Sequence, residues 1–136
     1  MRATAYHEAG HVVARHAFGF APTEVSIRRD GSGLVRGGAT TKRPGEIIII
    51  ALAGPVAEVL AAGARDLGTC RGDIVYAMRV LDAAYGADRA DEVFELHAAA
   101  AHDIVRARWA SVERVAEALL AKRRLSGRQV RALLAS

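Results

Sequence analysis

Apolar residues recur with helical spacing over most of this 136-residue chain. The first such stretch predicts a helix over residues 4–18 that ends at Gly19, because glycine readily takes the left-handed conformation that terminates helices. A second begins at Pro44, where a missing N–H costs nothing, and continues to Gly63 with a kink expected at Pro55. Alanine is abundant and aromatic residues make up only 5% of the chain, which points to closely packed helices.

The rest of the chain continues the helical pattern with short interruptions. A loop over residues 65–72 is expected to lead into a helix over 73–85 that ends at Gly86. Beyond it the pattern is helical almost to the end, with a break near Ser111, which can cap the next helix, and a final short helix capped by Ser126.

Period-two alternation of apolar and polar residues appears between the first two helices. Residues 24–29 read as a strand, 30–33 (Asp-Gly-Ser-Gly) as a turn, and 34–40 as a returning strand. The paired glycines in that second strand indicate a bulge or a close backbone approach. The predicted fold is therefore mainly α (α+β), a single helical domain over residues 1–136 with a small β-hairpin or sheet beside the first helix.

The first predicted helix carries the HExxH pattern His7-Glu8-Ala9-Gly10-His11. Histidines four apart project from the same side of a helix, about 6 Å apart, so both imidazoles can bind one metal ion. Glu8 leans toward the same side, close enough to act on a metal-bound water without binding the metal. The flanking residues are small and apolar, as a buried active-site helix requires. The alternative is a pair of surface histidines on an alanine-rich helix.

A catalytic zinc ion usually has three protein ligands, so the chain must supply another. Glu58 lies inside an apolar helix, where a charge needs a partner, and Asp73 lies where a glycine-containing loop meets an apolar run. Asp73 is equally suited to cap a helix, and spacing does not choose between the two acids. Cys70 is a competent ligand, but a lone cysteine more often acts as a small hydrophobe. The remaining histidines are expected away from the motif: His16, His97 and His102.

Composition limits the other classes of function. No apolar run reaches the ~18–20 residues of a membrane span, and the N-terminus lacks the order of a secretory signal. A single cysteine cannot form an internal disulfide, so a cytoplasmic location is expected. The net charge of +4 arises largely from a C-terminal cluster without interleaved aromatic residues, which is typical of a solvated helix end rather than a nucleic-acid site.

In chain order these segments resemble the peptidase domain of the FtsH-type ATP-dependent zinc metalloproteases, the M41 peptidases. Residues 5–11 are similar to that family's signature helix, 24–29 to its following strand, and 52–58 to its Gly-Gly-Arg-x-Ala-Glu-Glu helix. Gly72-Asp73 falls where the family has Asn-Asp, and residues 119–127 resemble its closing helix and turn.

The resemblance implies a ligand set and a role for each acid. By it, one zinc ion is bound by His7, His11 and Asp73, Glu8 is the catalytic base, and Glu58 holds a ligand histidine by its other ring N–H. The chain departs from the family in having Pro55, Val59 and Gly72 where the family has Arg, Glu and Asn. It also shows no phosphate-binding loop and no membrane helix of the ATPase part.

The implied activity is that of a zinc metalloendopeptidase acting on flexible or unfolded polypeptides, with a separate ATPase as a candidate partner and a homo-oligomer compatible with the apolar C-terminal helices. Either strand of the hairpin is a candidate to align an extended peptide. Tyr6 and Tyr76 are expected to be packing residues. The main alternative is a regulatory or binding module, zinc-containing or metal-free, without proteolytic activity; Glu8 favours the enzyme because a structural zinc site needs no base. A nucleic-acid-binding helical domain with an accidental motif is the third hypothesis.

Overall fold

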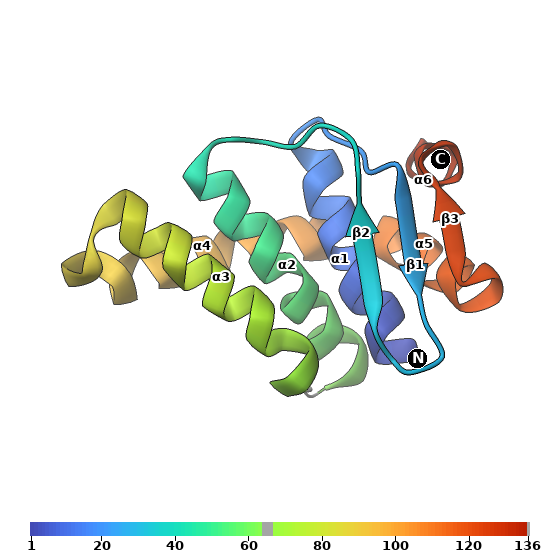
Figure 1. Ribbon diagram of the computed structural model, residues 1–136, viewed down its shortest axis with the longest axis horizontal. Coiled ribbons are helices and arrows are strands. Elements are labelled where there is room, and N and C mark those ends of the chain that lie inside the picture. Colours follow the sequence, from blue (N-terminus) through green and yellow to red (C-terminus); the bar gives the residue numbers. More distant parts are fainter. Residues whose placement is uncertain (64–66, 136) are drawn as a thin grey trace.

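A computed structural model describes residues 1–63 and 67–135, with the backbone alone for residues 67–69. It confirms the mainly α (α+β) class, because helices make up most of the structure and the short strands form one small antiparallel sheet (Figure 1). The elements in chain order are α1 (Arg2–Ala17), β1 (Glu24–Ile27), β2 (Gly33–Arg36), α2 (Pro44–Ala62), α3 (Leu67–Tyr85), the 3-10 turn η1 (Ala87–Arg89), α4 (Ala90–Ala107), α5 (Trp109–Lys122), β3 (Arg124–Ser126) and α6 (Gly127–Leu134).

Helix α1 lies at the centre of the main core. Helices α2 and α5 pack against it, and strands β1 and β2 also contact it (Figure 1). Its small side chains let neighbours approach closely: Ala5, Ala9 and Ala14 are fully buried. Tyr6 stacks on Trp109 of α5 with ring centroids 5.5 Å apart, which confirms its expected packing role.

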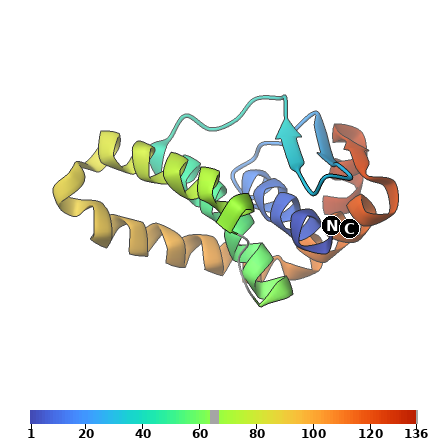
Figure 2. The same cartoon turned by 60° about the horizontal axis from the view of Figure 1, so that its bottom comes forward.

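A second core lies between α2, α3 and α4. It is formed by the buried residues Ile48, Ala51, Leu52, Ala77, Leu81, Val93 and Ala101. Helices α3 and α4 lie side by side and are joined through η1, at the far side of the molecule from the sheet (Figure 2). Helix α2 belongs to both cores and therefore connects them.

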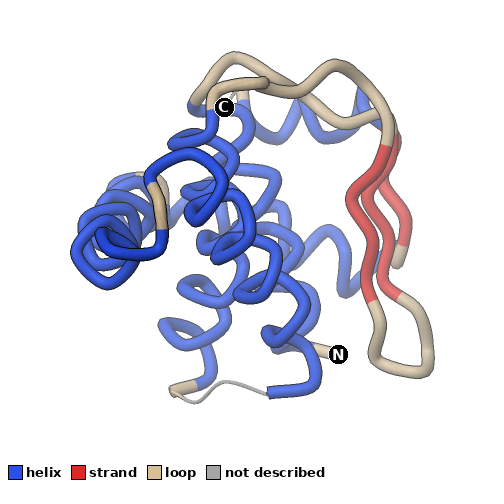
Figure 3. Tube along the Cα trace, turned by 60° about the vertical axis from the view of Figure 1, so that its left-hand side comes forward, coloured by secondary structure: helices blue, strands red, loops and turns tan. Residues whose placement is uncertain are grey.

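The three strands lie on one side of the helices in the order β2-β1-β3, all antiparallel (Figure 3). Val25 of β1 is opposite Val35 of β2 and Leu125 of β3, so β1 is the central strand. The predicted hairpin is confirmed, but the third strand was missed because its three residues between two helices are too short to show alternation. Strands β2 and β3 are the two edge strands, and β2 contacts α1.

Gly37 and Gly38 lie after β2, which ends at Arg36 instead of residue 40, and of the two predicted alternatives they make the close backbone approach. Gly37 and Gly38 both have positive φ (78° and 73°), which strains residues with side chains. A Cβ on Gly37 would overlap Thr23, and one on Gly38 would overlap the carbonyl oxygen of Ala21. The chain leaving β2 therefore runs tightly along the chain that enters β1.

Several predicted boundaries were wrong. Helix α3 begins at Leu67, so Asp73 lies inside it rather than capping it; residues 65 and 66 of the predicted loop lie outside the described part. The later break falls at Arg108 instead of Ser111, whose hydroxyl accepts a hydrogen bond from Arg114 (3.0 Å) within α5. Ser126 does cap α6, with a reciprocal bond pair to Gln129.

Helix α2 differs from the expectation that no segment suits a membrane. By length and composition its 19 residues are long and apolar enough to cross one, with a mean hydropathy of 1.9, and 44% of that window is buried within the described protein. The acidic residues Glu46 and Glu58 interrupt its apolar run, so counting uninterrupted residues missed it. The core helix of a soluble domain passes the same test, and α2 contacts α1, α3 and α4.

The α1–α2 contact depends on Gly10, where a Cβ would overlap the carbonyl of Ala53 and the methyl of Ala57. We expect Gly10→Ala to lower the thermal midpoint of unfolding, because overpacking costs roughly 1–3 kcal/mol and outweighs the roughly 1 kcal/mol gained in helix propensity. Gly72→Ala in α3 is the matched control: a Cβ at that position would have no atom within 4 Å, so this substitution should raise stability by about 0.5–1 kcal/mol. Equal gains from both substitutions, measured by calorimetry, would contradict this account of the packing.

Candidate metal centre

Helix α1 presents its two motif histidines from one side, as the spacing predicted. The rings of His7 and His11 lie with centroids 4.8 Å apart and planes at 76°. His7 and Glu8 are buried, whereas His11 is partly exposed toward a cavity of about 890 Å³. The surface-histidine alternative is therefore wrong.

The orientation of His11 is fixed by α2. Its Nδ1 lies 2.8 Å from the backbone carbonyl oxygen of Ile50. Because a carbonyl oxygen only accepts, Nδ1 donates a hydrogen to it, and Nε2 is the ring nitrogen that faces the other side. One turn further along α2, Gly54 leaves room for the ring, since a Cβ there would overlap its atoms.

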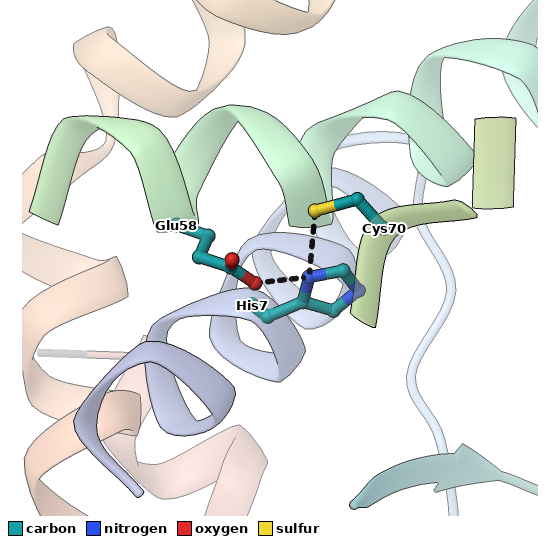
Figure 4. A group of neighbouring side chains, drawn as sticks. All are labelled: His7, Glu58 and Cys70. Carbon is teal, nitrogen blue, oxygen red and sulfur yellow. Dashed lines mark hydrogen bonds and ion pairs between the residues drawn. The ribbon is translucent and has the colours of Figure 1, made fainter. Parts of the chain in front are cut away.

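The orientation of His7 is fixed in the same way by a carboxylate. Nδ1 of His7 lies 3.0 Å from Oε1 of Glu58, which is 0% exposed (Figure 4). The sulfur of Cys70, a residue of α3, lies 4.0 Å from the same nitrogen. A carboxylate that accepts the Nδ1 hydrogen leaves Nε2 free to bind on the other side of the ring, and such support is common behind metal-bound histidines.

Asp73 contacts both motif histidines. Its Oδ2 lies 2.6 Å from Nε2 of His7 and 3.1 Å from Nε2 of His11. Helix α3 thus brings a carboxylate to the nitrogens that Glu58 and Ile50 leave free. Sequence spacing left Glu58 and Asp73 as equal candidates for the third ligand; in the structure Asp73 contacts both Nε2 atoms, whereas Glu58 contacts Nδ1 of His7.

The charges of this cluster influence one another strongly. Burial raises the pKa of Asp73, but the hydrogen bonds and charges of His11 and His7 outweigh it and hold that pKa well below its usual range. Burial lowers the pKa of His11, yet the hydrogen bond and charge of Asp73, with the charge of Glu8, raise it to about 9. Burial raises the pKa of Glu8 against the opposing effect of both histidines. The carboxylates therefore favour a positive charge among the Nε2 atoms.

Two groups of side chains in the described part have potential ligand atoms within 4.8 Å of one another and could hold a metal ion: His7, Glu8 and His11, and the buried set His7, Glu58 and Cys70. They lie at opposite edges of the His7 ring. The group of His7, Glu8 and His11, with Asp73 beside it, lines the cavity, which leaves room for a water molecule as a catalytic site does. The second is closed. Two imidazoles and a carboxylate form a donor set that suits zinc.

The cavity is a cleft between α1 and β2, and residues of α2 and α3, among them Ile50 and Asp73, also line it. Gly33 at the start of β2 lies directly against the Glu8 side chain, where a Cβ would overlap the carboxyl group. Tyr76 lines the cavity and is 53% exposed, so the packing role expected for it was wrong. Arg15 also lines it, one turn beyond His11. Sequence reasoning missed Arg15, although its spacing of four from His11 places it on the same face of α1.

The other histidines lie away from this cluster. His16 is exposed at the end of α1. Nδ1 of His97 lies 2.7 Å from the carbonyl oxygen of Val93, and its ring lies 5.7 Å from that of Tyr85, at a distance from the motif. His102 lines a smaller apolar cavity between α2, α3 and α4.

No protein-family model matches this chain, and no curated protein matches its sequence. Functional inference therefore rests on the site itself.

Zinc titration against a competing chelator separates the two groups around His7. We expect Asp73→Asn to weaken zinc affinity by at least the roughly 10–100-fold typical of losing a supporting partner, because it removes the charge shared by both Nε2 atoms. Cys70→Ala should bind zinc as the wild type does. Loss of zinc in Cys70→Ala with retention in Asp73→Asn would instead place the metal at the closed edge of the ring. Unfolding midpoints measured without metal control for misfolding.

Proposed function

We propose that the protein is a zinc-dependent metalloendopeptidase, similar in its site to the M41 peptidases. The observation that carries the proposal is the position of Glu8, a buried carboxylate beside two imidazole nitrogens and Asp73, at the wall of an open cleft. His7, His11 and Asp73 would hold the zinc ion, and Glu58 would hold His7 in the tautomer that binds it. Zinc bound in such a site lowers the pKa of a water ligand from about 15.7 toward about 7.

The role of Glu8 follows from its place. Its carboxylate accepts the proton of the attacking water as the water oxygen bonds to the peptide carbonyl carbon, and then gives the proton to the departing amine nitrogen. Burial raises the pKa of Glu8, which brings it nearer to neutral pH and favours both halves of this transfer. A structural site would not require a third carboxylate whose oxygen lies within 4.8 Å of a ring nitrogen of each motif histidine.

The shape of the cleft supports a flexible substrate. It lies between a helix and an edge strand, which suits an extended segment rather than a folded domain. Peptides, unfolded polypeptides or one exposed loop are therefore the proposed substrates, with a separate ATPase as the partner needed for folded ones. Cys70 is the single cysteine of the chain and cannot form an internal disulfide, which is compatible with the proposed cytoplasmic location.

A second candidate function has one observation in its favour. The closed set of His7, Glu58 and Cys70 resembles a structural metal site in its burial, so a metal held there would leave a binding or regulatory module without catalysis. The open side is favoured because it brings the Nε2 atoms of both motif histidines and the Asp73 carboxylate together beside the cavity.

Metal content and activity on an unfolded casein substrate test the proposal. We expect about one zinc per chain in both wild type and Glu8→Gln, with hydrolysis lowered at least ~100-fold in the variant because the general base is lost. Glu113→Gln, an exposed acid on α5, is the charge-matched control and should retain activity. Zinc without cleavage in the wild type would favour the binding module, and absence of zinc after metal loading would end the proposal.

Strand β2 has a free edge beside the cleft: β1 is paired on both sides, and β3, the other edge strand, contributes no described residue to the cleft lining. The N–H of Arg28 donates a hydrogen bond to the carbonyl oxygen of Ser32 (2.7 Å). Hydrogen-bonded and non-hydrogen-bonded pairs alternate along an antiparallel ladder, so the pair Val25–Val35 is not hydrogen-bonded and the N–H of Val35 points away from β1. We expect Val35→Pro to raise the KM for peptides several-fold, because the substrate loses a backbone hydrogen bond. Val35→Ala keeps the N–H and is the control. Equal KM values for the two variants would show that substrate does not pair with this edge.

A further inference from the structure

Arg15 is a buried cation on the catalytic face of α1. It follows His7 and His11 at the same spacing of four residues and is 8% exposed. Its Nη2 donates hydrogen bonds to the carbonyl oxygens of Gly37 (2.6 Å) and Ala39 (2.9 Å), in the segment that follows β2. Arg15 therefore holds the far end of the cleft together.

These two bonds do not balance the charge of Arg15. No carboxylate among the described residues lies within 4 Å of its guanidinium, and its Nε is buried without a hydrogen-bond partner. Arginine is rarely buried unless it is paired, because removing its charge from water is costly. An unpaired arginine at the wall of a cavity is what a site for an anionic group requires.

The electrostatic surroundings are polarised along the cleft. Arg36 ends β2, the segment after it carries Lys42 and Arg43, and residues 36 to 43 contain no acid. Arg36 and Arg43 have ion-pair partners, Glu24 and Glu46, in the described part, whereas Lys42 has none there. The opposite end of the cleft carries the carboxylate of Asp30. Among the described residues that line the cleft, Arg15 is the single lysine or arginine, so an extended peptide meets its positive charge at the end away from Asp30.

We propose that Arg15 is a specificity-determining residue that binds an acidic side chain of the peptide substrate, within about two residues of the bond that is cleaved. The inference rests on the proposed peptidase function and adds the class of substrate. One helical turn separates Arg15 from His11, about 6 Å, and an extended peptide advances about 3.3 Å per residue. A guanidinium binds a carboxylate through charge-assisted, often paired hydrogen bonds, so glutamate or aspartate fits and a neutral amide fits less well.

Cleavage-site profiling of the zinc-loaded wild type on a peptide digest tests the preference without any variant. We expect Asp and Glu to be enriched at a position one or two residues from the cut. The side on which they appear gives the direction of the peptide along β2, and either side supports the proposal. Cleavage without acidic enrichment would overturn the inference and leave the peptidase function standing.

A matched pair of synthetic peptides, with Glu or Gln at the enriched position, then tests Arg15 itself. The wild type should cleave the Glu peptide with a kcat/KM at least ~10-fold higher, as expected for a hydrogen bond to a charged group. Arg15→Gln should lose this ratio, whereas Arg106→Gln, an exposed charge-matched control on α4, should keep it. If Arg15 only anchors the segment after β2, Arg15→Gln would lower activity on both peptides and leave the ratio unchanged, which would overturn the proposal.

If no peptide is cleaved, the peptidase function is refuted, and peptide binding then tests the Arg15 recognition site by itself. Zinc-loaded Glu8→Gln protein is titrated with dye-labelled, alanine-rich octapeptides that carry a central Glu or Gln, and fluorescence anisotropy gives the Kd of each. Tighter binding of the Glu peptide that depends on Arg15 supports the recognition site. Equal affinities, or no binding of either peptide, overturn it.

Discussion

The close packing of α1 on α2 is the constraint on which the site depends. Gly10 lets the backbones approach, and Gly54 makes room for the imidazole of His11. At that distance α2 reaches both motif histidines from behind, with the Ile50 carbonyl on one Nδ1 and the Glu58 carboxylate on the other. A wider separation would leave each ring free to rotate and would leave a buried carboxylate without its partner. One helix contact therefore fixes the tautomer and orientation of both histidines.

The same contact decides where positive charge is stabilised. With both Nδ1 atoms occupied, the two Nε2 atoms point to the side where Asp73 enters from α3. Burial alone would lower the pKa of His11, yet the carboxylates around it raise that pKa to about 9. The carboxylates of Asp73 and Glu8 would attract a divalent cation to the same place, where it would replace the proton on the imidazole. The electrostatics and the hydrogen-bond directions thus favour the same side of His7.

Local patterns predicted the parts of this arrangement that local physics controls. The HExxH spacing sufficed to place His7, Glu8 and His11 on one face, and Gly19 and Ser126 marked real helix ends. The start of α3 was misplaced by six residues, because the glycine-containing segment before Asp73 looked like a loop, whereas in the structure it is already helical and carries the buried Cys70 against His7. The choice between Glu58 and Asp73 depends on how α2 and α3 pack against α1, and no spacing within a single segment contains that information.

Arg15 shows why a residue can be visible in the sequence and still be overlooked. Its periodicity with His7 and His11 was plain, but an arginine near a helix end usually complements the helix dipole in water. What distinguishes it is burial beneath the segment after β2, which depends on Gly37 and Gly38 adopting positive φ. Those glycines bring backbone carbonyls to Arg15 but bring no carboxylate. Two neutral acceptors locate the guanidinium without neutralising it, so one side chain both shapes the end of the cleft and keeps its charge for a ligand.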